Sequence, residues 1–104
     1  MINNVVLVGR LTAAPELKMT SGGKGVVNFT LAVPRMKEET DFIGCSAWGN
    51  TAKFMVDYLR KGSMVGCQGS IRVDRYTNQD NKKTTTWTVV CDTVWSLESK
   101  DTRR

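Results

Sequence analysis

Residues 41–48 carry two aromatic side chains on a face that is otherwise small and polar. A period of two is typical of a strand, and it places Phe42 and Trp48 on the same face as a glycine and a serine. Flat rings that stand on a shallow, accessible surface can stack nucleobases. The other face is expected to belong to the core. Its residues are Ile43, Cys45 and Ala47.

A third aromatic lies among charged residues in the segment 63–77. There the alternation assigns Arg72, Asp74 and Tyr76 to a polar face and leaves the apolar residues for the core. Arg75 is adjacent, so a ring and two guanidinium groups lie close together in the sequence, a combination that suits bases and phosphates. Ordinary packing at the edge of a core is the competing interpretation for any one of these rings.

Basic residues exceed acidic ones. The 104-residue chain has 15 Lys and Arg against 10 Asp and Glu, a net charge of +5. This balance favours an anionic partner, with nucleic acid first. Several cations fall in the first 37 residues, where only Glu16 opposes them, and we expect this region to suit a phosphate backbone. These cations are Arg10, Lys18, Lys24, Arg35 and Lys37.

The sequence offers little for catalysis or for metal binding, and we expect no enzymatic activity. It has no histidine, which removes the commonest general base and metal ligand, and its Asp and Glu residues show no paired spacing. Residues 21–25 lack the phosphate-loop pattern and are expected to form a hairpin turn. Because no two cysteines have zinc-ligand spacing, we expect buried free thiols in a reducing compartment, with no metal and no cofactor. The cysteines are Cys45, Cys67 and Cys91.

Five strands and one helix must position these residues. Strands are expected at residues 2–11, 24–33, 41–48, 63–77 and 83–97, with a short extended stretch at 16–20. Residues 51–59 have helical spacing of apolar side chains, with Asn50 or Thr51 as the cap. Gly62 is the expected stop. We expect the apolar side chains of the helix to be buried, together with Trp87 of the last strand. The helix residues are Phe54, Met55, Tyr58 and Leu59.

The order β-β-β-α-β-β, in a chain of this length, predicts an all-β fold with one helix. We expect a five-stranded OB-fold, a Greek-key barrel that binds oligonucleotides or oligosaccharides, with the helix between strands three and four. The domain is expected to span residues 1–97, with a short basic tail at 98–104. No window is apolar over the ~18 residues that a membrane helix needs. The N-terminus has no basic leader, so we expect a cytoplasmic chain.

Several dispersed segments in collinear order cover about residues 2–98. They are NNVVLVGRL at 3–11, PEL at 15–17, NFTLAV at 28–33, DFI at 41–43, WG at 48–49, YLRKGS at 58–63, and Gly69 with Arg72, Arg75 and Tyr76. In these segments the chain resembles the bacterial single-stranded DNA-binding protein (SSB) family. The resemblance implies an OB-fold that binds and coats single-stranded DNA with little sequence preference in DNA replication, recombination and repair. It also implies a homotetramer, with a dimer as the alternative.

The resemblance further implies which residues contact DNA. Its stacking positions fall on Phe42, Trp48 and Tyr76, the rings that alternation alone places on polar faces. Basic residues near the DNA are implied at four positions. These are Lys18, Lys61, Arg72 and Arg75.

The chain departs from the family pattern in the connector at residues 35–40, which is shorter than the usual hairpin and lacks an aromatic. Arg35 and Lys37 are its remaining candidates for DNA contact, so we expect a smaller footprint per subunit. Gly44 and Asp74 replace residues that are basic in some members, which is expected to weaken contacts to the DNA backbone.

The sequence after Glu98 lacks the disordered linker and the acidic tip by which the family recruits partner enzymes. We therefore do not expect recruitment of replication or repair proteins through this segment. Single-stranded RNA stays open as a ligand, because stacking tolerates either sugar. Two other functions also stay open: an OB-fold assembly factor whose aromatic face docks a protein, and a small nuclease.

Overall fold

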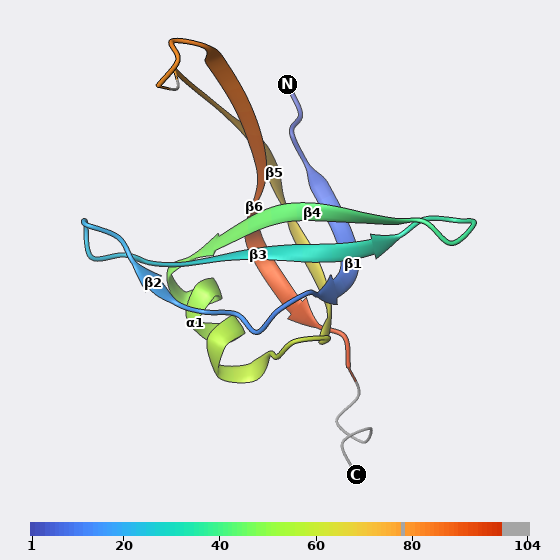
Figure 1. Ribbon diagram of the computed structural model, residues 1–104. Helices are drawn as coiled ribbons and strands as arrows, with labels where there is room; N and C mark the ends of the chain where they lie inside the picture. Colours follow the sequence, from blue (N-terminus) through green and yellow to red (C-terminus); the bar gives the residue numbers. More distant parts are fainter. Residues whose placement is uncertain (78, 99–104) are drawn as a thin grey trace.

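The order of strands and helix along the chain follows the predicted one (Figure 1). A computed structural model describes residues 1–77 and 79–98, with only the backbone of Tyr76. The elements are β1 (Val5–Leu11), β2 (Lys18–Met19), β3 (Gly25–Pro34), β4 (Thr40–Trp48), α1 (Gly49–Tyr58), β5 (Met64–Thr77) and β6 (Lys83–Ser96). The predicted stretch at 16–20 is the two-residue strand β2. The five predicted strands are β1, β3, β4, β5 and β6, so the helix follows the third of them, as predicted.

The sheet closes into a five-stranded barrel. Hydrogen-bonded neighbours follow the order β1-β5-β6-β4-β3, and β3 pairs back with β1 where Leu11 faces Leu31. The pairing of β4 with β6 is parallel, the other pairings in the barrel are antiparallel, and β2 extends the edge of β3. Gly9 permits the close approach of β1 to β3, because a Cβ there would lie 2.6 Å from the carbonyl oxygen of Ala32. This closed barrel with one helix confirms the predicted OB-fold class.

Helix α1 packs against β3, β4 and β6, below the barrel in the view of Figure 1. Ala52 and Met55 form its buried stripe, which the C-cap residue Leu59 continues. We expected Tyr58 to be buried, but it is exposed. It is the last residue of the helix and lies beside the buried stripe rather than in it. Its ring instead contacts the half-buried Phe54, with ring centroids 5.4 Å apart. Within the described ranges, no helix is long and apolar enough to cross a membrane.

The two ends of α1 differ from the predicted caps. Trp48 is the N-cap residue and its side chain makes no capping hydrogen bond, so the predicted caps at Asn50 and Thr51 are wrong. Gly49 has a φ of +60°, which turns the chain sharply out of β4 and starts the helix earlier than predicted. Gly62 does adopt a φ of +88°, but it lies three residues beyond the C-cap, in the turn that leads to β5.

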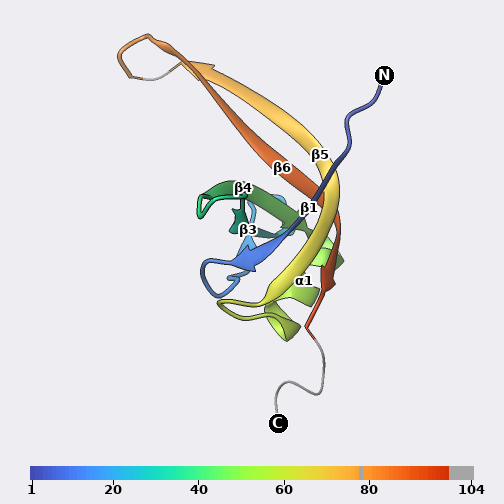
Figure 2. The ribbon, with the colours of Figure 1, turned by 90° about the vertical axis from the view of Figure 1, so that its right-hand side faces the viewer.

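The β5–β6 hairpin continues past the other strands as an arm, residues 72–77 and 83–88 (Figures 1 and 2). Inside the barrel, one face of each strand points into the core. On the arm, the same face is exposed to solvent, including Val73 and its cross-strand partner Trp87. The prediction that Trp87 is buried is therefore wrong: the side chain is 54% exposed. Alternation gives the phase of a strand but not the point at which the strand leaves the barrel.

Candidate nucleic-acid interface

The outer face of β4 carries the aromatic residues that alternation predicts. Phe42 is 68% exposed and Trp48 is 41% exposed, whereas Cys45 and Ala47 belong to the core. At a rise of about 3.3 Å per residue, the two rings stand about 20 Å apart along the strand. The exposed Gly44 and the buried Ser46 lie between them on the same face. The strand thus presents a low surface with a ring at each end.

Two adjoining hollows run across the barrel beside this face, and together we call them the β4 groove. Their volumes are about 230 Å³ and about 390 Å³, and they share Asn28 and Thr88. The first is lined by Asn28, Ser46, Trp48, Arg72, Asp74, Thr88 and Val90. The second is lined by Thr12, Ala13, Asn28, Phe29, Thr30, Gly44, Cys45 and Thr88. Most of the polar groups are neutral hydrogen-bonding side chains, and the indole ring and the guanidinium group lie in the same hollow.

Strand pairing brings the groove residues together from distant parts of the sequence. Asn28 of β3 faces Ser46 of β4, and Ser46 faces Val90 of β6. Arg72 of β5 faces Thr88 of β6. Sequence reasoning missed Asn28 and Thr88 as site residues, because a period of two assigns a face within each strand but does not say which strands are neighbours.

Arg72 supplies the positive charge of the β4 groove, and Asp74 lies beside it on the same face of β5. Its Nε atom lies 3.4 Å from an Asp74 carboxylate oxygen, with both side chains more than half exposed. An exposed pair of this kind contributes about 0–1 kcal/mol, so a phosphate can compete for the guanidinium group. Asp74 nevertheless reduces the positive potential that Arg72 offers.

Arg35 is held by two carboxylates in the turn between β3 and β4. Its Nε lies 2.9 and 3.0 Å from the two carboxylate oxygens of Asp41, and its Nη1 lies 3.2 Å from Glu39. The hydrogen bond from Arg35 lowers the pKa of Asp41, so this carboxylate is ionised at neutral pH. Arg35 is thus neutralised where it stands, whereas Lys37 is exposed at the tip of the same turn, with a φ of +68°.

The predicted arginines Arg72 and Arg75 lie on opposite faces of the arm. Arg75 borders a separate hollow of about 510 Å³ with Thr77 and Lys83. Tyr76 has the same phase along β5 as Arg72, but its side chain lies outside the described part of the structure. Its assignment as a stacking residue therefore stays a prediction.

Lys18 and Lys61 are exposed, and neither is among the described residues that line the β4 groove. Lys18 belongs to β2, where it faces Val26 at the edge of β3. Lys61 lies in the turn after α1, which is fixed by a hydrogen bond from the Gly62 N–H to the Leu11 carbonyl. Among the predicted site residues, the structure gathers Trp48 and Arg72 in one groove and leaves these two lysines outside it.

Comparison with known proteins identifies the family. The model of the single-strand binding protein family matches residues 2–97. The chain belongs to this family. It is 44% identical to the single-stranded DNA-binding protein of Enterococcus faecalis, over 96% of this chain and 56% of that protein. It is 43% identical to the single-stranded DNA-binding protein of Oceanobacillus iheyensis, over 96% of this chain and 66% of that protein.

A third relative, single-stranded DNA-binding protein 1 of Staphylococcus aureus, is 41% identical over 100% of this chain and 66% of that protein. The chain thus spans between about half and two thirds of the length of these family members. The family match covers the barrel and its arm, which confirms the resemblance seen in the dispersed segments of the sequence.

Proposed function

We propose that the chain binds single-stranded DNA without sequence preference and coats it during DNA replication, recombination and repair. Bases stack on Phe42, Trp48 and Tyr76, while lysines and arginines neutralise the phosphates. The observation that carries this proposal is the half-exposed ring of Trp48 in the same hollow as Arg72. In one groove, the ring can stack on a base and the cation can contact a phosphate, and these are the two repeating parts of a nucleic-acid strand.

Single strands suit this surface better than duplexes do. Stacking on a side chain requires a free base face, which a paired duplex does not offer. The neutral polar side chains of the β4 groove can form hydrogen bonds with any base, so the expected recognition is tolerant of sequence. The net charge of +5 adds a salt-dependent attraction that is common to all nucleic acids.

The protein acts as a homotetramer in the cytoplasm in this proposal. Support for assembly comes from β1, whose outward side chains Val6 and Val8 are exposed although they are apolar. Apolar side chains on a strand face are a ready surface for a second copy of the chain. Assembly brings several grooves onto one particle, so that one strand of DNA can occupy more than one of them.

Replacing Trp48 tests the proposal directly. We expect Trp48→Ala to weaken binding to oligo-dT by about 10- to 100-fold, because stacking on an aromatic side chain contributes about 1–3 kcal/mol per base. Stability should change little, because the ring is 41% exposed. Fluorescence anisotropy of a labelled oligonucleotide measures the affinity.

The matched control is Trp95→Ala, which removes an exposed ring near the end of β6, where it faces Gly66 and lies outside the β4 groove. Its affinity for oligo-dT should stay close to that of the unaltered chain. Unchanged affinity in a folded Trp48→Ala protein would show that the β4 groove does not stack bases.

A further inference from the structure

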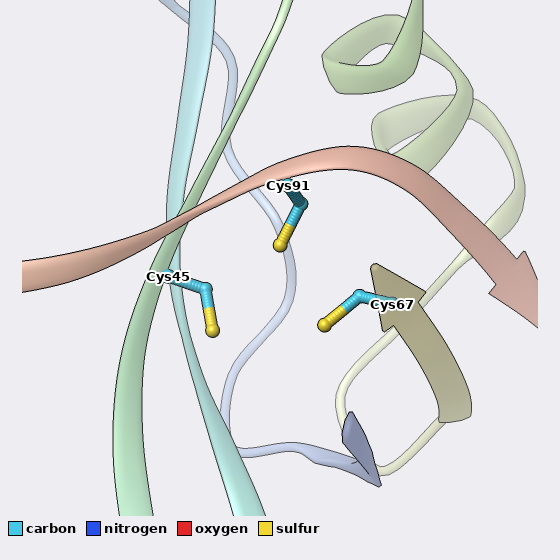
Figure 3. Close-up of side chains that lie close together, drawn as sticks. All are labelled: Cys45, Cys67 and Cys91. Atoms are coloured by element: carbon cyan, nitrogen blue, oxygen red, sulfur yellow. The ribbon is translucent and has the colours of Figure 1, made fainter. Parts of the chain in front are cut away.

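Three cysteine side chains meet inside the barrel, one from each of three neighbouring strands (Figure 3). Cys45 of β4, Cys67 of β5 and Cys91 of β6 are 2%, 0% and 4% exposed. Their Sγ atoms all lie within 4.8 Å of one another, and Figure 3 shows them turned toward a common point. We call this cluster the thiol triad. Cys45 also borders the β4 groove, whereas Cys67 and Cys91 are not among its lining residues.

The strand register argues against a disulfide that includes Cys91. Cys91 faces Gly69 on β5 and Ala47 on β4, so each of the other two cysteines is diagonal to it. Diagonal neighbours on a sheet have Cβ atoms roughly 7 Å apart, whereas a disulfide needs about 4 Å. Oxidation of Cys91 with either of the other two would therefore require the backbone to move.

The same spacing suits three sulfurs around one central atom. An atom that bonds three sulfurs at about 2.3 Å holds them roughly 4 Å apart, so small rotations of the side chains close the triangle. Among the described residues, no histidine, aspartate or glutamate joins the cluster. Tetrahedral zinc would need a fourth ligand, so the geometry favours a three-coordinate centre.

Several soft metal and metalloid centres bind thiolates, and the net charge of the resulting complex distinguishes them here. The triad lies in the apolar core, with Val27, Leu31 and Val65 in the same buried cluster. An uncompensated charge in such surroundings is costly. Three thiolates around a monovalent copper ion carry a net charge of −2, and around zinc a net charge of −1. Around a trivalent arsenic centre they are neutral.

We propose that the thiol triad is a binding site for trivalent arsenic, which Cys45, Cys67 and Cys91 hold as a neutral three-coordinate centre. Arsenous acid supplies the arsenic. Three As–O bonds break and three As–S bonds form, and each thiol proton leaves with a hydroxide as water. The oxidation state of arsenic does not change, so the step needs no oxidant or reductant.

Binding at this depth depends on transient opening of the barrel, because the sulfurs are almost fully buried. Arsenic should therefore bind slowly. Once bound, it links β4, β5 and β6 through the three sulfurs, which stabilises the folded state. Cys45 also borders the second hollow of the β4 groove, so the triad lies directly beneath part of that groove.

The experiment incubates the full chain with arsenite and removes the excess. We expect native mass spectrometry to show one arsenic per chain, thiol titration after unfolding in denaturant to show all three thiols blocked, and the thermal unfolding midpoint to rise. Loss of two thiols or none would overturn the proposal. A lower midpoint would also overturn it, because it would show that arsenic prefers the unfolded chain.

Single substitutions test whether all three sulfurs act together. Cys67→Ala and Cys91→Ala should each weaken arsenic binding by about 100-fold, because each further thiolate binds the same centre intramolecularly. Val89→Ala is the matched control, since it truncates a buried side chain of β6 and removes no sulfur. Equal binding by the cysteine variants and the control would overturn the proposal. If the variants do not fold, the thiol count of the unaltered chain still decides.

Discussion

Arg72 and Asp74 show how one carboxylate can set the strength of a nucleic-acid contact. The two side chains are close on the same strand, and Arg72 shares a hollow with Trp48. A phosphate that approaches this hollow meets a guanidinium group whose field is partly cancelled. The groove is therefore less basic than its arginine alone would suggest.

Asp74→Asn is expected to strengthen binding to oligo-dT by about 2- to 5-fold, because the exposed pair contributes no more than about 1 kcal/mol. The slope of log affinity against log salt concentration should become steeper by up to about 0.7 if a phosphate gains a full contact with Arg72. Titrations at several salt concentrations measure both quantities. Asp57→Asn on α1 makes the same change in net charge outside the groove and is the control. An equal effect of both variants would assign the gain to overall charge.

Alternation in the sequence was sufficient to predict the outward rings of β4. It placed Phe42 and Trp48 on the exposed face because both lie within a strand that the barrel covers on one side. The same kind of pattern failed for Tyr58 and Trp87. Phase tells which residues share a face, but whether another element covers that face depends on distant parts of the chain.

The pairing of β5 with β6 contains an irregularity, at which Asp92 is an extra residue on β6. The register shifts between Gln68 and Gly69, and a Cβ at Gly69 would overlap the backbone carbonyl oxygen of Val90. The Cα of Cys91 would also lie only 2.8 Å from that added carbon. Since these are backbone atoms, they cannot move aside without disturbing the ladder.

Gly69→Ala is therefore expected to destabilise the protein by about 2–3 kcal/mol. Gly44→Ala on β4 is the matched control, because a Cβ at Gly44 meets no described heavy atom within 4 Å, and its effect should stay within about 0.5 kcal/mol. Urea unfolding at one protein concentration measures both. Equal midpoints for the two variants would mean that β5 and β6 can shift to admit the extra carbon.

The long strands β5 and β6 were predicted from sequence to within a few residues of their ends, but the arm that they form was not. On the face of the arm that continues the core-facing side of the strands, only Val73 and Trp87 are apolar, and the other residues are polar, namely Arg75, Thr77, Lys83 and Thr85. Their exposure follows from the shorter lengths of the neighbouring strands. Length mismatch between paired strands is a property of the sheet and cannot be found in either segment alone.

At the scale of the whole molecule, closure of the barrel depends on pairings between distant segments. The parallel contact of β4 with β6 and the return of β3 to β1 link residues far apart in the sequence. The order and lengths of the elements predicted the OB-fold by analogy with a known architecture. Periodicity alone predicted where the strands lie in the sequence, but not which strands pair with each other. The β4 groove exists only because of these pairings.

Assembly of several chains is tested by placing a charge on the outer face of β1. Val8→Lys should lower the molecular mass measured by sedimentation equilibrium, because Val8 is exposed in the single chain and apolar. Val56→Lys, an exposed apolar position on α1, is the control and should not change the mass. An unchanged mass for Val8→Lys, with the protein assembled, would place the interface elsewhere.

The most direct test of single-strand binding uses the emission of Trp48 alone, in a chain that carries Trp87→Phe and Trp95→Phe. Oligo-dT should quench this emission more strongly as its length increases, and the quenching should persist at moderate salt, while duplex DNA should have little effect. The chain contains three tryptophans, so the variant reports on one defined ring in the β4 groove. If the emission stays unchanged while anisotropy shows that oligo-dT is bound, stacking on Trp48 is contradicted. If duplex and single strands change the emission equally, the binding reflects only the electrostatic attraction of a basic surface.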